Sequence, residues 1–213
     1  MTWSLGLNLA VFPLSIGILY DGHTVFEWTE DTRKTLFPSE ELPAELSTWC
    51  KRIGISVSDF AAIGIVEGPG NYTGLRLGSS IAQAISQVSK APIFGFPTGD
   101  AFIPQMAVRD TMCFVAIPAR KRELHVSLFS QQNRSRFSPS MIVSVSDFLE
   151  MLNRFSKPIS VVGPDLHDLD AFPHIDLCEM PLYGGTLAKM AFRSHQKGEG
   201  PEPVVLNYAY AAV

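Results

Sequence analysis

Alternating apolar and polar residues along the first thirty positions predict three consecutive strands. Residues 3–9 place their large apolar side chains on one face, and residues 14–20 follow as a second apolar stretch. Asp21 and Gly22 form a strong hairpin signal, which leads into a third strand over residues 24–29. We therefore expect a three-strand antiparallel meander at the start of the chain.

Helical spacing replaces this alternation after Ser39. That serine is a suitable N-cap, and apolar residues recur at helical intervals until Gly54 closes the helix. Residues 61–66 form a continuous apolar run of strand length, which is typical of a buried parallel strand. A second helix over residues 74–89 and a short strand over residues 93–96 complete this part of the pattern.

The same order of elements returns in the second half of the chain. The predicted strands span residues 112–117, 123–129, 141–145 and 159–162. A helix begins after Ser146, and a last helix spans residues 187–192. Three strands, a helix, a strand and a helix thus occur twice, which indicates an α/β protein with two lobes of one architecture. We place the lobes at residues 1–100 and 101–213, with the boundary near residues 97–110.

Composition narrows the classes of protein further. With 213 residues, of which 46% are hydrophobic and 18% charged, the chain can bury a substantial core and is not disordered. Its net charge of -4 excludes broad electrostatic binding of nucleic acid, which needs a strongly basic domain. The apolar N-terminal stretch lacks a basic segment and contains glycine, asparagine and proline, which argues against a signal peptide or membrane helix. We expect a cytoplasmic protein without membrane association, in which Cys50, Cys113 and Cys178 are buried thiols.

A glycine-rich loop joins the strand of residues 61–66 to the second helix. Backbone N–H groups at a helix N-terminus can bind an anion, but the glycine spacing here matches neither the dinucleotide nor the phosphate-loop template. A structural role is equally open, with a tight turn at Pro69 and Gly70 and with Thr73 as the helix cap.

Small residues at every fourth position give the second helix a nearly bare ridge. The ridge consists of Gly74, Gly78, Ala82 and Ser86. We expect a separate apolar face, which includes Ile81, Ile85 and Val88, to lie toward the core. A bare ridge allows another helix to approach closely. It suits a contact with a second chain, and a neighbouring helix of the same chain would serve equally.

The loop resembles the signature of a known family. Residues 68–76 read Gly-Pro-Gly-Asn-Tyr-Thr-Gly-Leu-Arg, which is similar to the Gly-Pro-Gly-Ser-Phe-Thr-Gly-Leu/Val-Arg segment of the bacterial TsaB (YeaZ) family. Residues 115–125 resemble a second segment of that family, Ala-Ile-Asp-Ala-Arg-Arg-Gly-Glu-Val-Tyr, and the similarity extends over most of the chain. We call residues 68–76 the signature loop. Its candidate site residues are Gly68, Pro69, Gly70, Tyr72, Thr73, Gly74 and Arg76.

This resemblance implies two ribonuclease-H-like lobes of the actin, sugar-kinase and heat-shock-ATPase (ASKHA) type, with a reduced second lobe. It implies a non-catalytic subunit of the machinery that makes N6-threonylcarbamoyladenosine (t6A) on tRNA. The implied partners are the catalytic paralogue TsaD, the ATPase TsaE and, through the complex, tRNA, while the isolated chain is expected to be able to form a homodimer. In the family the heterodimer forms through the early helices. The corresponding interface residues are Leu42, Leu46, Trp49, Gly74, Gly78, Ala82 and Ser86.

Arg120, Lys121 and Arg122 form the main basic cluster of the chain. A hairpin turn is an ordinary place for solvated charge. The alternative is a local contact with tRNA phosphate or with a partner protein.

Two positions depart from the family pattern in a way that bears on catalysis. Asn8-Leu9-Ala10 stand where the first strand of the family ends in Asp-Thr-Ser, and Pro118 stands where the second lobe has its Asp. Neither side chain supplies the anionic oxygen that a hard cation prefers. We therefore expect no catalytic residue, no metal site and no cofactor on this chain, because ATP and metal belong to the partner subunits.

Two enzymatic alternatives remain open. An independent nucleotide-binding enzyme of the ASKHA fold, a kinase or ATPase, should keep acids at positions 8 and 118. A metal-dependent glycopeptidase needs paired histidines at helical spacing, and the sequence has none. The nearest metal-like cluster is the acidic stretch 165–170 with His174 and Asp176, a pattern that is also typical of a surface loop.

Overall fold

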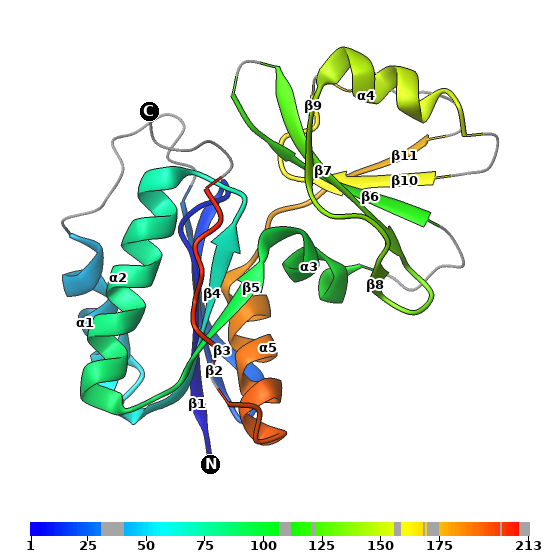
Figure 1. The fold of residues 1–213 in the computed structure, drawn as a ribbon. Coiled ribbons are helices and arrows are strands. Elements are labelled where there is room, and N and C mark those ends of the chain that lie inside the picture. Colours follow the sequence, from blue (N-terminus) through cyan, green and yellow to red (C-terminus); the bar gives the residue numbers. More distant parts are fainter. Residues whose placement is uncertain are drawn as a thin grey trace.

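The predicted meander forms one half of the first sheet. In the computed structural model, β1 (Trp3–Asn8), β2 (Leu14–Tyr20) and β3 (His23–Glu30) are antiparallel neighbours. β4 (Phe60–Gly68) and β5 (Ile93–Pro97) extend the sheet in parallel to β1, which gives the strand order β3-β2-β1-β4-β5 (Figure 1). The structure describes residues 1–30, 41–106, 112–120, 122–155, 159–167, 169, 175–200 and 202–208.

Helices cover both faces of this sheet. α1 (Leu42–Arg52) and α2 (Tyr72–Ser89) lie on one side, and α5 (Gly184–Gln196) lies on the other (Figure 1). A short 3-10 helix, η2 (Val57–Asp59), precedes β4. The N-cap residue of α1 is Glu41, whereas the expected cap, Ser39, is outside the described residues.

The second sheet repeats the strand order of the first. β6 (Met112–Pro118), β7 (Glu123–Ser130) and β9 (Met141–Ser144) are antiparallel neighbours, and β10 (Ile159–Gly163) and β11 (Ile175–Glu179) continue in parallel to β6. The order β9-β7-β6-β10-β11 therefore corresponds to β3-β2-β1-β4-β5. This confirms two α/β lobes of one architecture.

Several elements differ from the prediction. The pattern did not predict α3 (Thr98–Phe102), η3 (Ile103–Gln105), β8 (Ser135–Arg136) or β11. α4 (Val145–Leu152) begins earlier than expected, because Ser144 rather than Ser146 caps it by accepting a hydrogen bond from the Asp147 N–H at 3.0 Å.

The last helix returns to the first sheet. α5 belongs to the range 101–213, yet it contacts β1, β2 and β4. Its seat is a row of glycines, Gly6, Gly17 and Gly64, which are neighbours across the three strands. A Cβ on Gly64 would collide with the Leu187 carbonyl oxygen, and one on Gly17 would collide with the backbone of Gly185. The missing side chains therefore let the helix backbone lie directly on the sheet.

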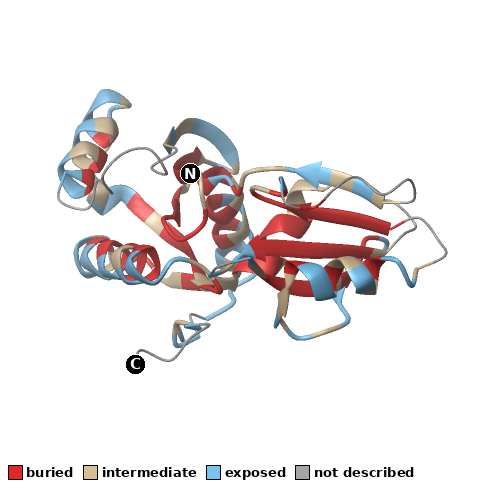
Figure 2. Ribbon diagram, turned by 90° about the horizontal axis from the view of Figure 1, so that it is seen from above, coloured by how far each residue is buried: buried red, intermediate tan, exposed pale blue. Residues whose placement is uncertain are grey.

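Buried residues follow the central strands and the inner faces of the helices (Figure 2).

Burial raises the pKa of the Cys50 thiol to about 11 and that of Cys113 to about 12, which keeps both protonated near neutral pH. Cys178 is exposed, contrary to the expectation of three buried thiols, because its position on β11 leaves the side chain at the surface. Over the described ranges, no helix is long and apolar enough to cross a membrane.

Candidate functional site around the signature loop

The signature loop is pressed against the end of β1. The Asn71 N–H donates to the Ala10 carbonyl oxygen at 2.7 Å, and a Cβ on Gly70 would lie 2.9 Å from the Ala10 Cβ. A Cβ on Gly74 would collide with the Leu9 carbonyl oxygen. The glycines at positions 70 and 74 therefore permit a close backbone approach that any other residue would prevent.

The helix that follows begins at Tyr72, earlier than the predicted start at Gly74. Its N-cap is Asn71, whose Oδ1 accepts a hydrogen bond from the Gly74 N–H at 3.0 Å. Thr73, the expected cap, is instead an exposed residue of the first turn. Asparagine and threonine are both good N-cap residues, so the sequence did not distinguish them. The backbone does, because Asn71 is extended and the helix already begins at Tyr72.

Three exposed side chains gather at this end of α2. The Arg76 guanidinium lies over the Tyr72 ring, 5.4 Å from its centroid, and its Nη1 donates to the Tyr72 hydroxyl at 3.2 Å. The Tyr208 ring packs on the other tyrosine with a centroid separation of 4.7 Å. We call Tyr72, Arg76 and Tyr208 the tyrosine–arginine cluster.

The chain brings Tyr208 to this place through a C-terminal strap, residues 202–208. The Asn207 N–H donates to the Glu67 carbonyl oxygen at 2.7 Å, and the Val205 N–H donates to the Glu67 carboxylate at 3.3 Å. Gly68 has a φ of +112°, and a Cβ there would collide with the Asn207 carbonyl oxygen. The first glycine of the signature thus makes room for the strap. Burial, together with the nearby Glu202, raises the pKa of Glu67, although the Val205 hydrogen bond opposes this.

The small-residue ridge of α2 faces its own chain. Ala82 is fully buried, and Gly74 and Gly78 lie against Leu9. Ser86 is half-buried, and its hydroxyl donates to a backbone carbonyl at 2.7 Å. Leu9, just after β1, already contacts the N-terminal part of the ridge, and the role of Gly74, Gly78, Ala82 and Ser86 in a partner interface stays a prediction.

The predicted interface residues of α1 are also turned inward. Leu42 and Leu46 are 0% and 2% exposed and belong to the core of the first lobe. Trp49 is half-buried and packs against the rings of Phe26 and Trp28, at centroid distances of 5.2 and 5.4 Å. These side chains fix α1 on the sheet, and their contact with a partner stays a prediction, for which the half-buried Trp49 is the most accessible of the three.

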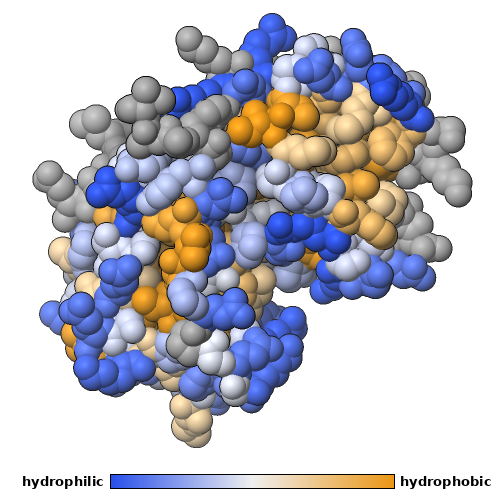
Figure 3. Space-filling view, viewed as in Figure 1, coloured by the Kyte–Doolittle hydropathy of each residue, from blue (hydrophilic) through white to orange (hydrophobic). Residues whose placement is uncertain are grey.

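The outer face of α2 is what remains accessible. Val88, which the pattern assigned to the core, is 61% exposed. The residues of the outer face are Tyr72, Thr73, Arg76, Ser80, Gln83, Ala84, Gln87 and Val88. Arg76 is the only charged residue between the helix bounds. On the face of the molecule seen in Figure 3, hydrophobic residues form separated groups on both lobes rather than one continuous patch.

Asn8, at the end of β1, is fully engaged in structure. Its Nδ2 donates to the carbonyl oxygens of Val11 at 2.9 Å, Pro13 at 3.2 Å and Leu182 at 2.8 Å, while its Oδ1 accepts from the Val11 N–H at 3.1 Å. The side chain is completely buried, and the Ser15 hydroxyl donates to the same Leu182 carbonyl at 2.9 Å. This amide therefore ties the first sheet to the segment that leads into α5.

The residues at this place do not fit a magnesium nucleotide. A carboxylate at position 8 would face three carbonyl oxygens, and the amide that is present offers no anionic oxygen. Pro118, at the exposed end of β6, has neither an acidic group nor an N–H. The next N–H, that of Ala119, already donates to the Glu123 carbonyl oxygen at 2.9 Å.

With this geometry in view, sequence comparison identifies the relatives of the chain. A family model described as TsaD, tRNA N6-adenosine threonylcarbamoyltransferase, matches residues 39–164, which is more than half of the chain. The chain belongs to this family. Within it, the similarity is to the TsaB (YeaZ) members: the tRNA threonylcarbamoyladenosine biosynthesis protein TsaB of Bacillus subtilis (strain 168) is 22% identical over 163 residues, which cover 76% of this chain and 70% of that protein.

Solved structures show the same fold. YeaZ from Pseudomonas aeruginosa matches with a TM-score of 0.72 and 19% identity, over 99% of this chain and all of that one. The ethanolamine utilization protein EutJ from Carboxydothermus hydrogenoformans matches with a TM-score of 0.53 and 9% identity, over 89% of this chain and 90% of that one. The predicted ASKHA-type fold is thus confirmed.

The basic cluster of this TsaB-type chain lies in the turn between β6 and β7. Arg120 and Arg122 are exposed, the Glu123 N–H donates to the Arg120 carbonyl oxygen at 3.0 Å, and Arg122 has a φ of +64°. Lys121 is outside the described residues. Arg120 and Arg122 thus belong to a tight turn, and contact of the basic cluster with tRNA or a partner stays a prediction.

The acidic stretch 165–170, considered above as a possible metal site, makes ordinary side-chain contacts where it is described. His167 lies 3.2 Å from Asp165 and 3.4 Å from Glu179, whereas Asp168, Asp170 and His174 fall outside the described residues. Within the part of the chain that the structure describes, no group of three or more His, Cys, Asp or Glu residues could hold a metal ion.

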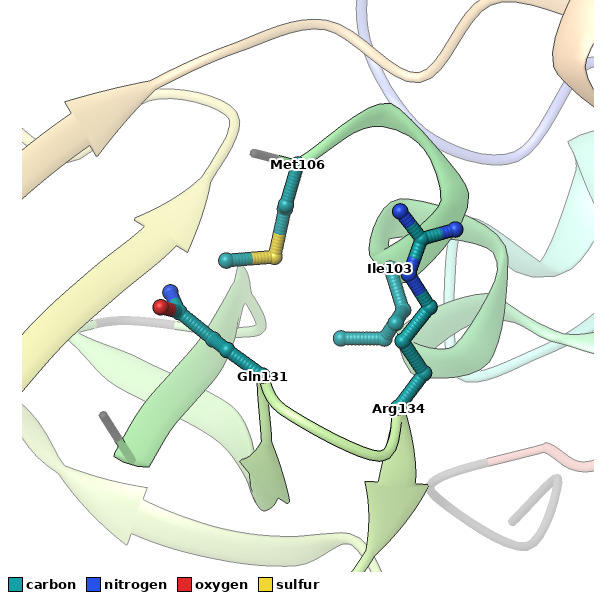
Figure 4. Close-up of a pocket in the computed structure, with 4 residues that line it drawn as sticks. All are labelled: Ile103, Met106, Gln131 and Arg134. Carbon is teal, nitrogen blue, oxygen red and sulfur yellow. The ribbon is translucent and has the colours of Figure 1, made fainter. Parts of the chain in front are cut away.

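A small hollow opens between η3 and the turn that joins β7 to β8. Ile103, Met106, Gln131 and Arg134 line it, and their side chains leave no room inside it for even a water-sized molecule (Figure 4). Pockets for small-molecule ligands usually measure about 300–1,000 Å³. The hollow is therefore not a substrate site.

Proposed function

We propose that this protein is a non-catalytic subunit of the t6A machinery, which activates the catalytic paralogue TsaD by docking on it. The family model describes a tRNA N6-adenosine threonylcarbamoyltransferase, and the Bacillus subtilis relative is a tRNA threonylcarbamoyladenosine biosynthesis protein. Involvement in t6A biosynthesis follows from membership of this family. We place it in the cytoplasm, where TsaE and tRNA also act, and tRNA reaches it only through the complex.

The main support for a non-catalytic role comes from the hydrogen bonds of the Asn8 amide. In an ASKHA-type enzyme this strand end would present an acid to the metal and phosphates, but here Nδ2 donates to three backbone carbonyls. A buried amide whose hydrogens are already bound to backbone carbonyls has none left to donate to a phosphate, and its neutral oxygen cannot replace a carboxylate on a metal ion. This observation opposes the ATPase or kinase alternative. The metal-dependent glycopeptidase alternative lacks support for a different reason, since no group of three or more His, Cys, Asp or Glu among the described residues could hold a metal ion.

The docking surface that we propose is the outer face of α2 with the adjoining exposed residues of α1. Its inward residues are committed to the core, so the outer face is the part of the early helices that a partner can reach. That face is uncharged apart from Arg76 and carries the exposed apolar side chain of Val88. In isolation the same face can pair with a second copy of the chain.

The test is reconstitution with TsaD, TsaE and tRNA from the same organism. We expect t6A formation to require this chain, and we expect the chain alone to show no magnesium-dependent ATP hydrolysis. Val88→Glu should weaken binding to TsaD by about tenfold or more, because it buries a charge at the contact. Val25→Glu is the matched control, since Val25 on β3 is also exposed, at 48%, but lies away from α2.

The outcomes separate the alternatives. ATP turnover by the chain alone, lost when Asn8 is replaced, would establish an independent enzyme. Full t6A formation without the chain would remove the activator role. Equal binding of TsaD by the Val88 and Val25 variants would move the interface away from α2.

A further inference from the structure

The outer face of α2 ends in a cluster built from two distant parts of the chain. Tyr72 and Arg76 belong to the first turns of the helix, and Tyr208 arrives on the C-terminal strap. All three side chains are at the surface, with exposed fractions of 43% for Tyr72 and 38% for Tyr208. Tyrosine and arginine are the residue types that contribute most to binding at protein interfaces.

Arg76 is held in place before any partner arrives. Its guanidinium lies over the Tyr72 ring and also donates to the hydroxyl of the same residue. Two contacts therefore hold the charged end of the Arg76 side chain. Fixing a flexible side chain in advance reduces the entropy that binding would otherwise cost. Among the described residues, no carboxylate forms an ion pair with this guanidinium.

The strap is what completes the arrangement. Backbone hydrogen bonds from Val205 and Asn207 to Glu67 fix its path, and Leu206 packs against the core cluster that contains Leu75. That path brings the Tyr208 ring onto Tyr72, on the aromatic side chain that supports Arg76. The strap therefore acts on the guanidinium through one intervening ring.

The charges around the cluster indicate the chemistry of its partner. The chain has a net charge of -4, yet residues 71–90 contain Arg76 and Lys90 and no acid. A fixed guanidinium that forms no ion pair with a described carboxylate, on an otherwise uncharged helix face, fits a carboxylate presented by another protein. Nucleic acid fits less well, because phosphate tracking needs several cations along a groove.

We infer that the tyrosine–arginine cluster is a preformed anchor for an acidic side chain of the partner protein, and that the C-terminal strap positions it. This inference rests on the proposed function, since it assigns the anchor to the surface that docks on TsaD. Arg76 makes the contact. Tyr208 is a positioning residue that acts through Tyr72.

The experiment is a double-mutant cycle on the affinity for purified TsaD from the same organism. Arg76→Ala should weaken binding by about tenfold. Tyr208→Ala should weaken it by about threefold, because the guanidinium loses part of its support. The double variant should bind no more weakly than Arg76→Ala, and Tyr208→Phe should bind like the wild type, because it keeps the ring. The loss caused by Arg76→Ala should shrink at high salt.

Two controls lie outside the cluster. Arg154→Ala removes the same charge from the second lobe, and Val205→Ala removes a side chain that is 70% exposed on the same strap. Both should bind TsaD like the wild type.

Each result decides one point. No binding of TsaD by the wild type contradicts the proposed function itself. Wild-type binding together with undiminished binding by Arg76→Ala overturns only the anchor. Additive losses from Tyr208 and Arg76 overturn the positioning role of the strap, and a loss of tRNA affinity with unchanged TsaD affinity assigns the cluster to nucleic acid instead.

Discussion

At the scale of single residues, Asn8 shows how one side chain can connect distant parts of the chain. An asparagine differs from an aspartate by one amino group, and in this chain that group donates to the carbonyls of Val11, Pro13 and Leu182. An aspartate could accept but could not donate, so the two side chains are not interchangeable here. The residue that would hold a cation in an enzyme instead connects the first sheet to the segment before α5.

Asn8→Asp is therefore expected to destabilise the protein without creating a nucleotide site. The variant loses both amide hydrogens, which three carbonyl oxygens share, and places a buried carboxylate against those oxygens; this should lower the free energy of unfolding by about 2 kcal/mol or more. Urea unfolding measures this. Ser15→Ala is the control, because it removes a single donor to the Leu182 carbonyl and should cost about 1 kcal/mol. An unchanged unfolding midpoint, or a gain of magnesium-dependent ATP binding, would contradict this account of position 8.

At the scale of secondary structure, backbone contact matters more than side-chain packing where α5 meets the sheet. Three glycines in register form its seat, and the helix itself begins with Gly184 and Gly185. The Gly185 N–H donates to the Glu27 carboxylate at 2.9 Å, so a side chain of the edge strand β3 serves the helix N-terminus. Burial raises the pKa of Glu27, while the hydrogen bonds from Gly185 and Gly184 oppose the rise.

Gly64→Ala tests this seat. The added methyl group would meet the Leu187 carbonyl oxygen and the Ala191 Cβ, so α5 must move off the sheet. We expect a loss of about 1–3 kcal/mol in the free energy of unfolding, measured by denaturant titration. Gly200→Ala is the matched control, because a Cβ there would have no atom within 4 Å. Equal stability of the two variants would mean that the helix is not seated on the glycine row.

How far the sequence predicts these elements depends on the range of the interactions. Alternation and hairpin chemistry are local, so β2 was predicted at its observed bounds and the meander of the first lobe was recovered, whereas β8 and β11 of the second lobe were missed. On α2, Ile81 and Ile85 are buried as predicted but Val88 is exposed, and the neighbour of the small-residue ridge stayed open, because glycines spaced four apart suit a close backbone as well as a partner helix. The Asn8 contacts depend on Leu182, 174 positions away, and the tyrosine pair joins residues 72 and 208. No local pattern encodes such pairs.

At the scale of the whole molecule, the short stretch 181–183, which joins β11 to α5, is bound by residues from several parts of the chain. Leu182 is held by Asn8 and Ser15 of the first sheet, and the Gln105 amide donates to the Pro181 carbonyl oxygen at 3.4 Å. The Tyr183 N–H in turn donates to the Gln105 side-chain oxygen at 3.5 Å. Two side chains of the first sheet and one from η3, the 3-10 helix before β6, therefore bind the same short stretch. This arrangement suits a subunit that presents a fixed surface to its partner.

Stability of the whole chain should depend on pH through a buried histidine of the second lobe. His125 on β7 is 5% exposed, and burial lowers its pKa below the ordinary value of 6.5, although the nearby Glu123 opposes the shift. The folded state thus binds a proton less readily than the unfolded state, so unfolding takes up a proton once the pH falls below about 6.5. The stability that neutral His125 provides is fully present above that pH and is lost on acidification.

We therefore expect the free energy of unfolding of the wild type to fall between pH 7.5 and pH 5.5, and that of His125→Gln to fall less over the same interval. Burial acts in the opposite direction on Glu27 and Glu67, whose raised pKa values favour the folded state as acid is added. Comparing the slopes of the two proteins, rather than the wild-type curve alone, cancels those carboxylates and isolates the histidine. His23→Gln, at an exposed position of β3, is the control and should keep the wild-type slope. Parallel curves for the wild type and His125→Gln would show that another group controls the acid response of the fold.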